Sequence, residues 1–316
     1  MNRAFLLLPV AAMLAACDPE MPAPPPPPAP LPEPAPEQRP VPRAVRSGES
    51  ASAAVFYRTV ERRLLAQGLL RQDGGGPDAP VDAALLARNF ERIALFSEYV
   101  QVGGRYVAQQ SRAQLRRWER PVRIELHFGA SVPPETQIAD RRTVSGYVAR
   151  LRRLTGHPIS LVERGGNYHI FVASIDEQRA LGPAISAAEP ALSRSTIREI
   201  TALGRDTYCA VYASSSTAKP DSYVSAIALI RSEHPDLMRL SCYHEEIVQG
   251  LGLANDSPSA RPSIFNDDEE FALLTRHDEL LLKMLYDPRL RVGMSAEQAR
   301  PIIRQIASEL VGSGPV

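Results

Sequence analysis

The spacing of apolar residues after position 50 predicts several amphipathic helices. A surface helix buries one stripe of side chains, so its apolar residues recur every three or four positions. Thr196 and Glu199 also have the spacing of a capping box, which predicts a short helix beginning at Thr196. The other predicted helices are residues 53–70, 83–96, 143–154, 235–251, 278–286 and 296–311.

A different pattern, in which every second residue is apolar, predicts strands. Residues 99–108 are expected to form a hairpin that turns at Gly103-Gly104. The segments before and after Gly165-Gly166 are expected to pair with each other as two strands. That pair is residues 159–162 and 168–173. The other predicted strands are residues 122–128, 208–212 and 223–230.

The order of these elements predicts an α+β fold. Strands and helices are mixed along the middle of the chain, and only helices follow residue 251. We therefore expect a mixed β-sheet, one helix at 235–251 directly after the last strand, and a helical C-terminal subdomain.

The N-terminus has the pattern of a secretory signal peptide. Arg3 precedes an apolar run from Ala4 to Ala16, which is shorter than the roughly 20 residues needed to span a bilayer. The run ends in Leu14-Ala15-Ala16-Cys17, which resembles the lipobox of bacterial lipoproteins. The resemblance implies cleavage after residue 16 and a lipid on Cys17. Asp18 resembles a retention signal and favours the inner membrane over the outer membrane.

A proline-rich segment follows the predicted lipidation site. Residues 19–43 contain 13 of the 29 prolines, which excludes a helix or a central strand and favours polyproline II. We interpret residues 17–48 as a lipidated cysteine and spacer, and residues 49–316 as the globular domain. A PxxP ligand for a recognition domain is the alternative interpretation of the proline run.

Charge and cysteine content narrow the classes of partner. Lys and Arg together number 36, as do Asp and Glu, so no net field favours nucleic acid, and we expect no nucleic-acid partner. Cys209 and Cys242 are the cysteines of the predicted mature domain. In an oxidising compartment they are expected to form a disulfide, with a metal pair or two thiols as alternatives.

The residues with most chemical potential lie at the end of the helix 235–251. Glu245 and Gln249 are one turn apart on one face, and Glu246 lies beside them. Gly252 allows the helix to end, after which Asn255 and Asp256 can fold back toward that face.

This frame resembles the metzincin motif HExxHxxGxxH with each histidine replaced. Glu245 and Gln249 take the positions of the helical ligand pair, and Asn255 or Asp256 takes that of the third ligand. Glu246 keeps the position of the general base. The resemblance implies a zincin-like active-site helix. A literal HExxH beginning at His244 fails, because residue 248 is valine.

A wider set of motifs resembles an uncharacterised family of Gram-negative lipoproteins, a domain of unknown function with a suspected zincin-like relationship. The resemblance covers roughly residues 85–312, and the family has no established activity to transfer. The motifs that carry it are the run from Glu245 to Ser257, then Ser263-Ile264-Phe265-Asn266-Asp267, then Leu285-Tyr286-Asp287-Pro288-Arg289-Leu290.

The candidate ligands differ from those that zinc prefers. Zinc favours imidazole and thiolate, whereas carboxylate and amide oxygens suit a hard divalent cation such as calcium or magnesium. Without a tightly bound zinc, no water is activated for Glu246 to deprotonate. We therefore predict no cofactor, with a divalent cation as the alternative and zinc as the least suitable ion.

Three functions remain open from the sequence. The favoured one is a non-catalytic binding module, anchored by its lipid on the periplasmic face of a Gram-negative membrane, with an envelope protein or peptide as partner. The second is a metal-assisted hydrolase of peptide or peptidoglycan, resembling a metallopeptidase, with Glu246 as general base. In the third, the site has no chemical role, and Glu245 and Glu246 form only a solvated helix face.

Other motifs give weaker indications of function. Ser216 and Lys219 match SxxK, but Pro220 excludes the helix that this motif needs. Asn266 and Asp267 are interpreted as a structural turn, with oxygen ligation as the alternative. The histidines make no i, i+4 pair, so a histidine metal site would require tertiary contacts; they are His127, His157, His169, His234, His244 and His277.

Overall fold

The central β-sheet has β6 (Tyr168–Ala173) in its middle, and every residue of that strand is buried. In the computed structural model, β3 (Arg117–Trp118) pairs in parallel with the beginning of β8, beside β6. The order of the other five strands across the sheet is β5 (Ile159–Val162), β4 (Val122–Phe128), β6, β8 (Lys219–Arg231) and β7 (Cys209–Ser216). The strands are parallel except β7, which runs antiparallel along one edge.

The structure describes residues 46–102, 105–266 and 268–312. The predicted signal peptide, the lipidation site at Cys17 and the proline-rich spacer up to residue 45 lie outside this range, as do Gly103-Gly104 and Asp267. Within it, no helix has an apolar stretch long enough to cross a membrane.

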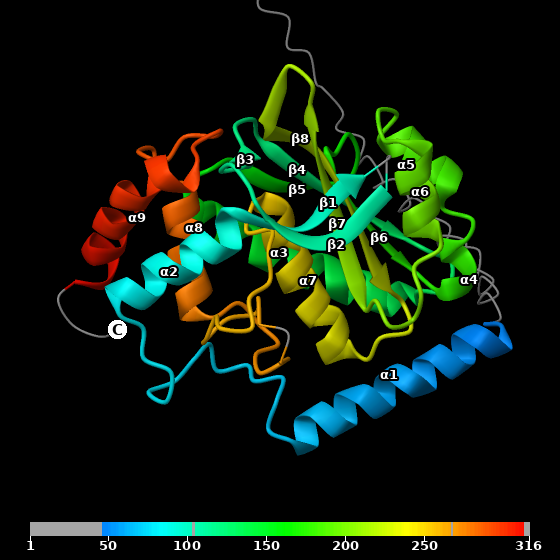
Figure 1. Ribbon diagram of the computed structural model, residues 1–316. Coiled ribbons are helices and arrows are strands. Elements are labelled where there is room, and N and C mark those ends of the chain that lie inside the picture. Colours follow the sequence, from blue (N-terminus) through cyan, green and yellow to red (C-terminus); the bar gives the residue numbers. More distant parts are fainter. Residues whose placement is uncertain (1–45, 103–104, 267, 313–316) are drawn as a thin grey trace, which may run out of the picture. The chain divides into compact units, whose positions relative to one another are not determined.

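Helices cover both faces of the sheet. One face packs against α3 (Pro134–Thr155) and α7 (Asp236–Leu251), which also contact each other. The other face packs against α5 (Gly182–Ala188) and α6 (Arg194–Thr201), which follow the short α4 (Ile175–Gln178). Figure 1 shows α7 crossing the middle of the molecule and α5 and α6 beside β7. The predicted α+β class is therefore confirmed.

The helical part lies at the end of the sheet where β3 begins. It consists of α2 (Ala83–Ala94), α8 (Arg276–Leu285) and α9 (Ala296–Val311), which pack on one another and share the main core with the sheet. Further from it, α1 (Gly48–Ala66) packs through Tyr57 and Leu64 onto a smaller cluster that includes Met238 at the start of α7.

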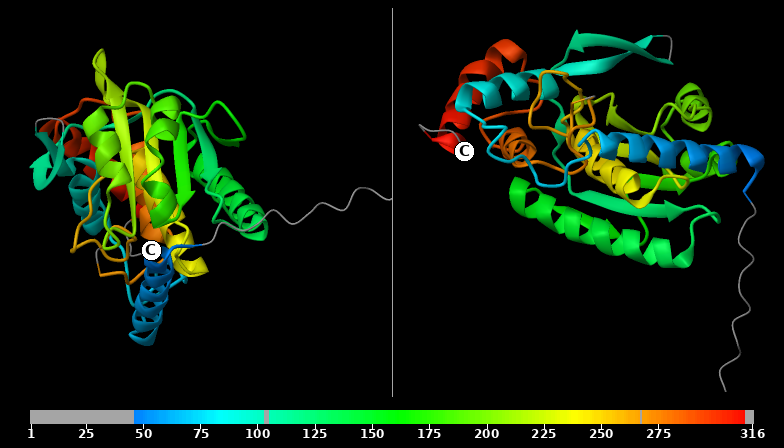
Figure 2. Two further views of the ribbon diagram at one scale, coloured as in Figure 1. Left: turned by 90° about the vertical axis from the view of Figure 1, so that its right-hand side faces the viewer. Right: turned by 90° about the horizontal axis from the view of Figure 1, so that it is seen from below.

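A hairpin of β1 (Phe96–Val102) and β2 (Arg105–Arg112) stands apart from the central sheet. It follows α2 directly, and β2 contacts α6. In Figure 1 the hairpin passes in front of β7, and Figure 2 (right) shows it and α3 on opposite sides, with α7 between them. The predicted hairpin at 99–108 is confirmed.

Two local predictions are wrong. Strands β5 and β6 do not pair with each other, because each pairs in parallel with β4 from opposite sides. The helix α6 begins at Arg194, since Ser193 rather than Thr196 caps it by accepting a hydrogen bond from the Thr196 N–H. The elements α3, β7 and β8 are also longer than the segments 143–154, 208–212 and 223–230 that were predicted for them.

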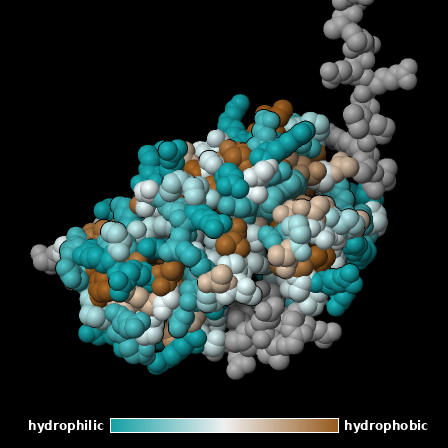
Figure 3. Space-filling model, turned by 90° about the horizontal axis from the view of Figure 1, so that it is seen from above, coloured by the Kyte–Doolittle hydropathy of each residue, from teal (hydrophilic) through white to brown (hydrophobic). Residues whose placement is uncertain are grey.

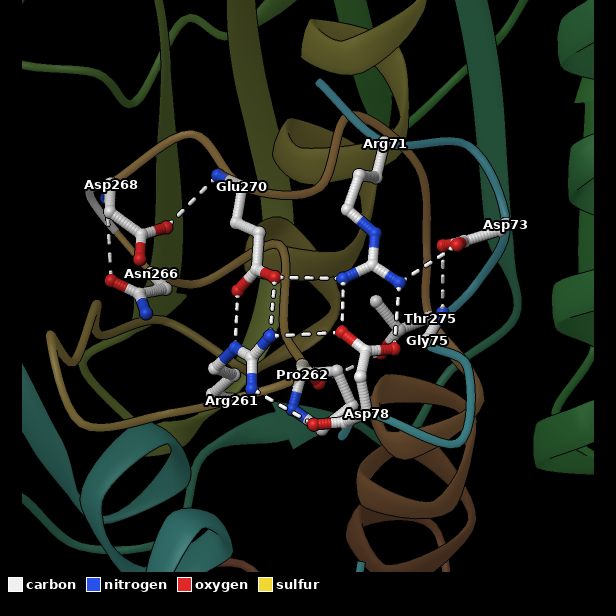
Figure 4. A network of polar contacts seen from close by, with 10 residues as sticks. All are labelled: Arg71, Asp73, Gly75, Asp78, Arg261, Pro262, Asn266, Asp268, Glu270 and Thr275. Atoms are coloured by element: carbon white, nitrogen blue, oxygen red, sulfur yellow. Dashed lines mark hydrogen bonds and ion pairs between the residues drawn. The ribbon is translucent and has the colours of Figure 1, made fainter. Parts of the chain in front are cut away.

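An ion-pair network fixes two irregular segments to each other (Figure 4). The Arg71 guanidinium bonds Asp73, Asp78 and Glu270 at 2.8, 2.7 and 2.9 Å. Arg261 bonds Asp78 and Glu270 at 3.1 and 2.6 Å. The network therefore joins the connection between α1 and α2 to the segment between α7 and α8.

Figure 3 shows that the upper face is mostly hydrophilic, with apolar residues in small separate patches.

Candidate functional site

The helix α7 is tied to the edge strand β7 by a disulfide between Cys242 and Cys209. The predicted pairing of these cysteines is confirmed. Since Cys209 is the first residue of β7 and Cys242 lies in the middle of α7, the bond holds the edge strand against the polar face of the helix.

Buried and half-buried aromatic side chains also hold the last two turns of α7. The Trp118 Nε1–H donates to the Gly250 carbonyl at 2.8 Å, and the Tyr286 hydroxyl donates to Leu251 at 3.1 Å. These carbonyls lie in the final turn, where no helical N–H remains to bond them. The Tyr168 hydroxyl donates to the Glu246 carbonyl at 2.5 Å. Burial is the main cause that raises the pKa of Tyr168 well above its usual value.

The helix ends at Gly252, as the sequence predicts. Gly252 has a φ of +130°, and a β-carbon there would lie 2.4 Å from the Arg116 carbonyl oxygen. No side chain fits at this position, so the chain after α7 bends close to the segment that leads into β3.

A cavity of about 700 Å³ lies along β7 and the polar face of α7. We call it the β7 cleft. Its walls are residues of β7, the end of α6 and the base of the β1–β2 hairpin. The polar and charged residues of its lining are Ser97, Ser111, Arg112, Arg116, Glu199, Thr207, Tyr212, Tyr223, Glu245, Glu246, Gln249 and Asp256.

Two carboxylates converge in the β7 cleft. Oxygens of Glu245 and Glu246 and the sulfur of Cys209 all lie within 4.8 Å of one another. Glu246 is 3% exposed, whereas Glu245 is half-buried. The structure therefore brings together the two glutamates that the sequence singled out.

Gln249 and Asp256 also line the cleft and contact each other. The Gln249 Nε2–H donates to Asp256 Oδ1 at 3.0 Å. This bond joins the last turn of α7 to the chain beyond Gly252, which folds back as the sequence predicts.

Asn255 lies elsewhere. Its side chain is fully buried, and its Nδ2–H donates to the carbonyls of Arg92 and Asp256 at 2.9 and 2.8 Å. It is not part of the cleft lining. The geometry therefore separates Asn255 from the other candidate ligands and gives it contacts that fix the turn after α7.

His244 faces away from the cleft. Its ring stacks on Tyr147 at 3.9 Å, and its Nδ1 accepts a hydrogen bond from the Leu274 N–H at 3.0 Å. Burial, and secondarily Arg150, lowers the pKa of His244 to about 3. The imidazole is therefore neutral at physiological pH and belongs to the contact between α7 and α3.

The donor set of the cleft does not fit zinc. The sulfur beside the glutamates belongs to a disulfide and is not a thiolate. No histidine is among the residues that line the cleft. What remains is carboxylate and amide oxygen, which suits a hard cation or a basic ligand group.

Sequence reasoning missed the opposite wall of the cleft. Arg112, Arg116 and Glu199 lie at least 37 positions before the start of α7, and no local pattern links them to it. Arg112 pairs with Glu297 at 2.8 Å, and Arg116 pairs with Asp221 at 3.6 Å. The Tyr212 hydroxyl donates to Glu199 at 3.2 Å.

The SxxK match at Ser216 and the turn that begins at Ser263 make structural contacts. Ser216 ends β7 and Lys219 begins β8, so the two residues flank a tight turn with no helix between them. Ser263 donates to Asp278 at 2.6 Å, and Phe265 is buried, which fixes this turn to the start of α8. Asn266 accepts from the backbone of Asp268 at 3.3 Å and does not line the cleft (Figure 4).

Comparison with known protein families identifies a match. A family model described as a protein of unknown function (DUF2927) matches residues 83–305. That range includes every residue that lines the β7 cleft and leaves α1 outside. No curated protein and no solved structure matches the chain.

Proposed function

The chain belongs to the DUF2927 family of proteins of unknown function, and we propose that its β7 cleft binds an extended peptide segment of an envelope partner. The observation that carries the proposal is an edge strand with a cavity along it. Among the described residues, β7 pairs only with β8, so its other edge faces the cleft. An exposed strand edge binds extended peptides by adding a strand, with pockets for alternate side chains.

The charge of the lining supports a basic side chain in the bound segment. Four carboxylates line the cleft, from Glu199, Glu245, Glu246 and Asp256. The two guanidinium groups of the lining pair with carboxylates that do not line it. An arginine or lysine of the partner would meet Glu245 and Glu246 together, and a charge-assisted hydrogen bond in a partly buried site is stronger than a neutral one.

The zincin-like frame supports a site that binds without cutting. In this proposal α7 keeps the helix, the glycine bend and the glutamate of that class, but the ligand positions hold Glu245, Gln249 and Asn255. Because Asn255 is buried among backbone carbonyls and the lining has no imidazole, we propose no catalytic zinc and no hydrolysis.

The test is selection of short random peptides against the purified full chain, followed by affinity measurements on the selected peptides. We expect enrichment of peptides with an arginine or lysine, and an affinity that falls as salt is raised. Ala213→Arg fills the cleft beside β7 and should weaken binding at least about 10-fold. Glu246→Gln should weaken it by about 10-fold, since it removes one partner of a charge-assisted bond.

Matched variants elsewhere serve as controls. Ala184→Arg adds the same side chain at an exposed position of α5, and Glu163→Gln removes an exposed carboxylate. Both should leave the affinity unchanged. Selected peptides that bind Ala213→Arg as tightly as the unaltered protein would overturn the proposal.

Convergence of Glu245 and Glu246 within 4.8 Å favours one second candidate, a metal-assisted hydrolase. Paired carboxylates can hold a hard cation, and Glu246 could then act as general base. The selected peptides and peptidoglycan fragments are incubated with the protein and added magnesium or calcium, and products are detected by mass spectrometry. Cleavage that is lost in Glu246→Gln would make the hydrolase the better description.

The cellular location of the protein is proposed from its N-terminal sequence. We infer that Cys17 carries the lipid and that the proline-rich segment holds the globular domain away from the periplasmic face of the membrane, with Asp18 favouring the inner membrane. A tethered module of this kind meets partners that lie in or near the envelope.

A further inference from the structure

A second group of chemically capable side chains lies on the central strands, separate from the β7 cleft. Glu125 and His127 are two positions apart on β4, so they point to the same face of the sheet. His169 lies directly opposite Glu125 on the neighbouring strand β6. None of the three lines the cleft, and β8 separates their strands from β7. Two histidines and a carboxylate thus converge through tertiary structure.

The donor atoms of this group have the spacing of metal ligands. His127 Nε2 lies 3.0 Å from His169 Nδ1. The glutamate approaches both rings, with Oε1 3.6 Å from His127 Nε2 and Oε2 3.9 Å from His169 Nδ1. Metal–nitrogen and metal–oxygen bonds of about 2.1 Å in a tetrahedral site place ligand atoms about 3.4 Å apart. The observed distances lie on both sides of that value, so shifts of a few tenths of an ångström suffice.

The backbone around Glu125 is shaped to hold its carboxylate. The connection from β5 to β6 passes over β4 at this point, and the Gly166 N–H donates to Glu125 Oε2 at 2.9 Å. A β-carbon on Gly166 would lie 2.7 Å from the Glu125 β-carbon, so only glycine permits this approach. Asn167 fixes the connection, because it accepts from the Arg123 N–H at 2.7 Å and donates to the Pro121 carbonyl at 3.0 Å.

The imidazole rings of His127 and His169 are packed against the protein on one side, and the site opens to solvent beside His127. His127 stacks on Phe171 at 4.5 Å, on the face of the sheet that packs against α5 and α6. The side chain of His169 is 7% exposed and that of Glu125 is 14% exposed, whereas His127 is 32% exposed. An ion could therefore enter from solvent beside His127 and keep a water ligand. Glu189 carries negative charge near His169, and Arg141 carries positive charge near His127.

We propose that Glu125, His127 and His169 form a binding site for a divalent transition-metal ion, with zinc as the probe ion. Two imidazoles and one carboxylate with an open fourth position suit zinc and its neighbours in the first transition series, and not calcium or magnesium. The hydrogen bond from Gly166 orients the carboxylate in the way that outer-shell contacts orient metal ligands. This site is independent of the proposed peptide binding.

The test is zinc titration of the full chain after treatment with a chelator, measured by calorimetry. We expect one zinc per chain. His127→Ala and His169→Ala should each weaken zinc binding at least about 100-fold, since each removes a direct ligand. Saturating zinc should also raise the melting temperature of the unaltered protein and leave that of His169→Ala unchanged. Cobalt offers a second readout, because tetrahedral coordination gives it visible absorption.

Controls separate this site from the cleft and from folding defects. His157→Ala, which removes a half-buried histidine elsewhere, and Gln249→Ala, which alters the cleft, should both keep one zinc. Glu125→Gln keeps the shape of the side chain and the acceptor for Gly166 but loses the charge, so it should fold and still bind zinc more weakly. Absence of zinc binding by the unaltered chain, or zinc retained in both histidine variants, would overturn the inference.

Discussion

Single glycines decide how closely the end of α7 approaches its neighbours. A β-carbon at Gly250 would lie 2.2 Å from the Tyr168 hydroxyl oxygen, so this helical glycine makes room for the bond from Tyr168 to Glu246. Glycine inside a helix costs about 1 kcal/mol relative to alanine, which the buried hydrogen bond and the packing of Tyr168 offset. The sequence shows where Gly250 is, but not that a tyrosine from β6 occupies the space beside it.

The buried His244 predicts a loss of stability in mild acid. Its pKa is near 3 in the folded protein, mainly because of burial, and about 6.5 in an unfolded chain. Between these values the unfolded state binds more protons, so the free energy of unfolding falls as the pH falls from 6.5 toward 3. His244 alone should lower it by about 2 kcal/mol between pH 7 and pH 5.

The measurement is urea unfolding at both pH values for the unaltered chain and His244→Asn. The asparagine oxygen can accept from the Leu274 N–H in place of Nδ1, but it does not titrate. The variant should be less stable at pH 7 and lose about 2 kcal/mol less on going to pH 5. Tyr147→Phe, which removes a hydrogen bond to the His244 carbonyl without removing the imidazole, should retain the full pH difference. An equal difference in all three proteins would contradict the assignment.

At the scale of elements, strands with clear alternation were the most predictable. β4 has the predicted bounds of 122–128, because apolar residues at every second position face one buried side of a sheet. The pairing of β5 and β6 was wrong for a reason that alternation does not report. A short connection with two glycines is typical of a hairpin, but here it crosses the face of β4 and leaves two parallel strands.

The start of α6 illustrates a second limit. Ser193 and Thr196 are both suitable caps, three residues apart, and capping contributes only about 1 kcal/mol. Ile200 is buried against the sheet from either start, so its burial does not distinguish the two caps. In the structure Ser193 caps the helix by accepting from the Thr196 N–H, a choice that the local sequence alone does not determine.

The disulfide between β7 and α7 predicts a defined loss of stability. Replacing Cys209 and Cys242 by serine together opens a loop with a sequence separation of 33 residues. In the chain-entropy model the free energy of unfolding should fall by roughly 3 to 4 kcal/mol. Urea unfolding of the double variant should match that of the unaltered chain in reductant, and affinity for a selected peptide should fall because the edge strand is no longer held against α7.

A loss below about 1 kcal/mol in the double variant would show that packing alone holds β7 in place. As a control, Cys17→Ser alone should leave the unfolding free energy of the domain unchanged, since Cys17 does not take part in this disulfide.

For the whole molecule, the sequence located one wall of the cleft and missed the other. The helix frame placed Glu245, Glu246 and Gln249 together, because residues three and four apart share a face. The wall formed by the hairpin base and the end of α6 depends on how distant segments pack. The histidines on β4 and β6 make no i, i+4 pair, so the sequence does not bring them together for the same reason. The available signal was Glu125-x-His127 on one predicted strand and His169 on another.

The predicted lipid anchor is tested on the whole chain. Cys17→Ser removes the atom that would carry the lipid, so the protein should move from the membrane fraction to the soluble fraction after cell lysis. A single acyl chain binds membranes only marginally, whereas two chains anchor stably, so the change should be nearly complete. Mass spectrometry of the N-terminal peptide checks the modification directly. If the unaltered protein is found in the soluble fraction, the predicted lipid anchor is contradicted.

The hairpin β1–β2 limits how anything could reach the free edge of β7. Its base lines the cleft through Ser97, Ser111 and Arg112, and β2 contacts α6 beside the cleft. In Figure 1 the hairpin also passes in front of β7. A folded domain would therefore meet the hairpin before it met the edge strand, whereas a chain end or an unstructured stretch needs less room. The partner expected from the proposed peptide binding is a segment of that kind.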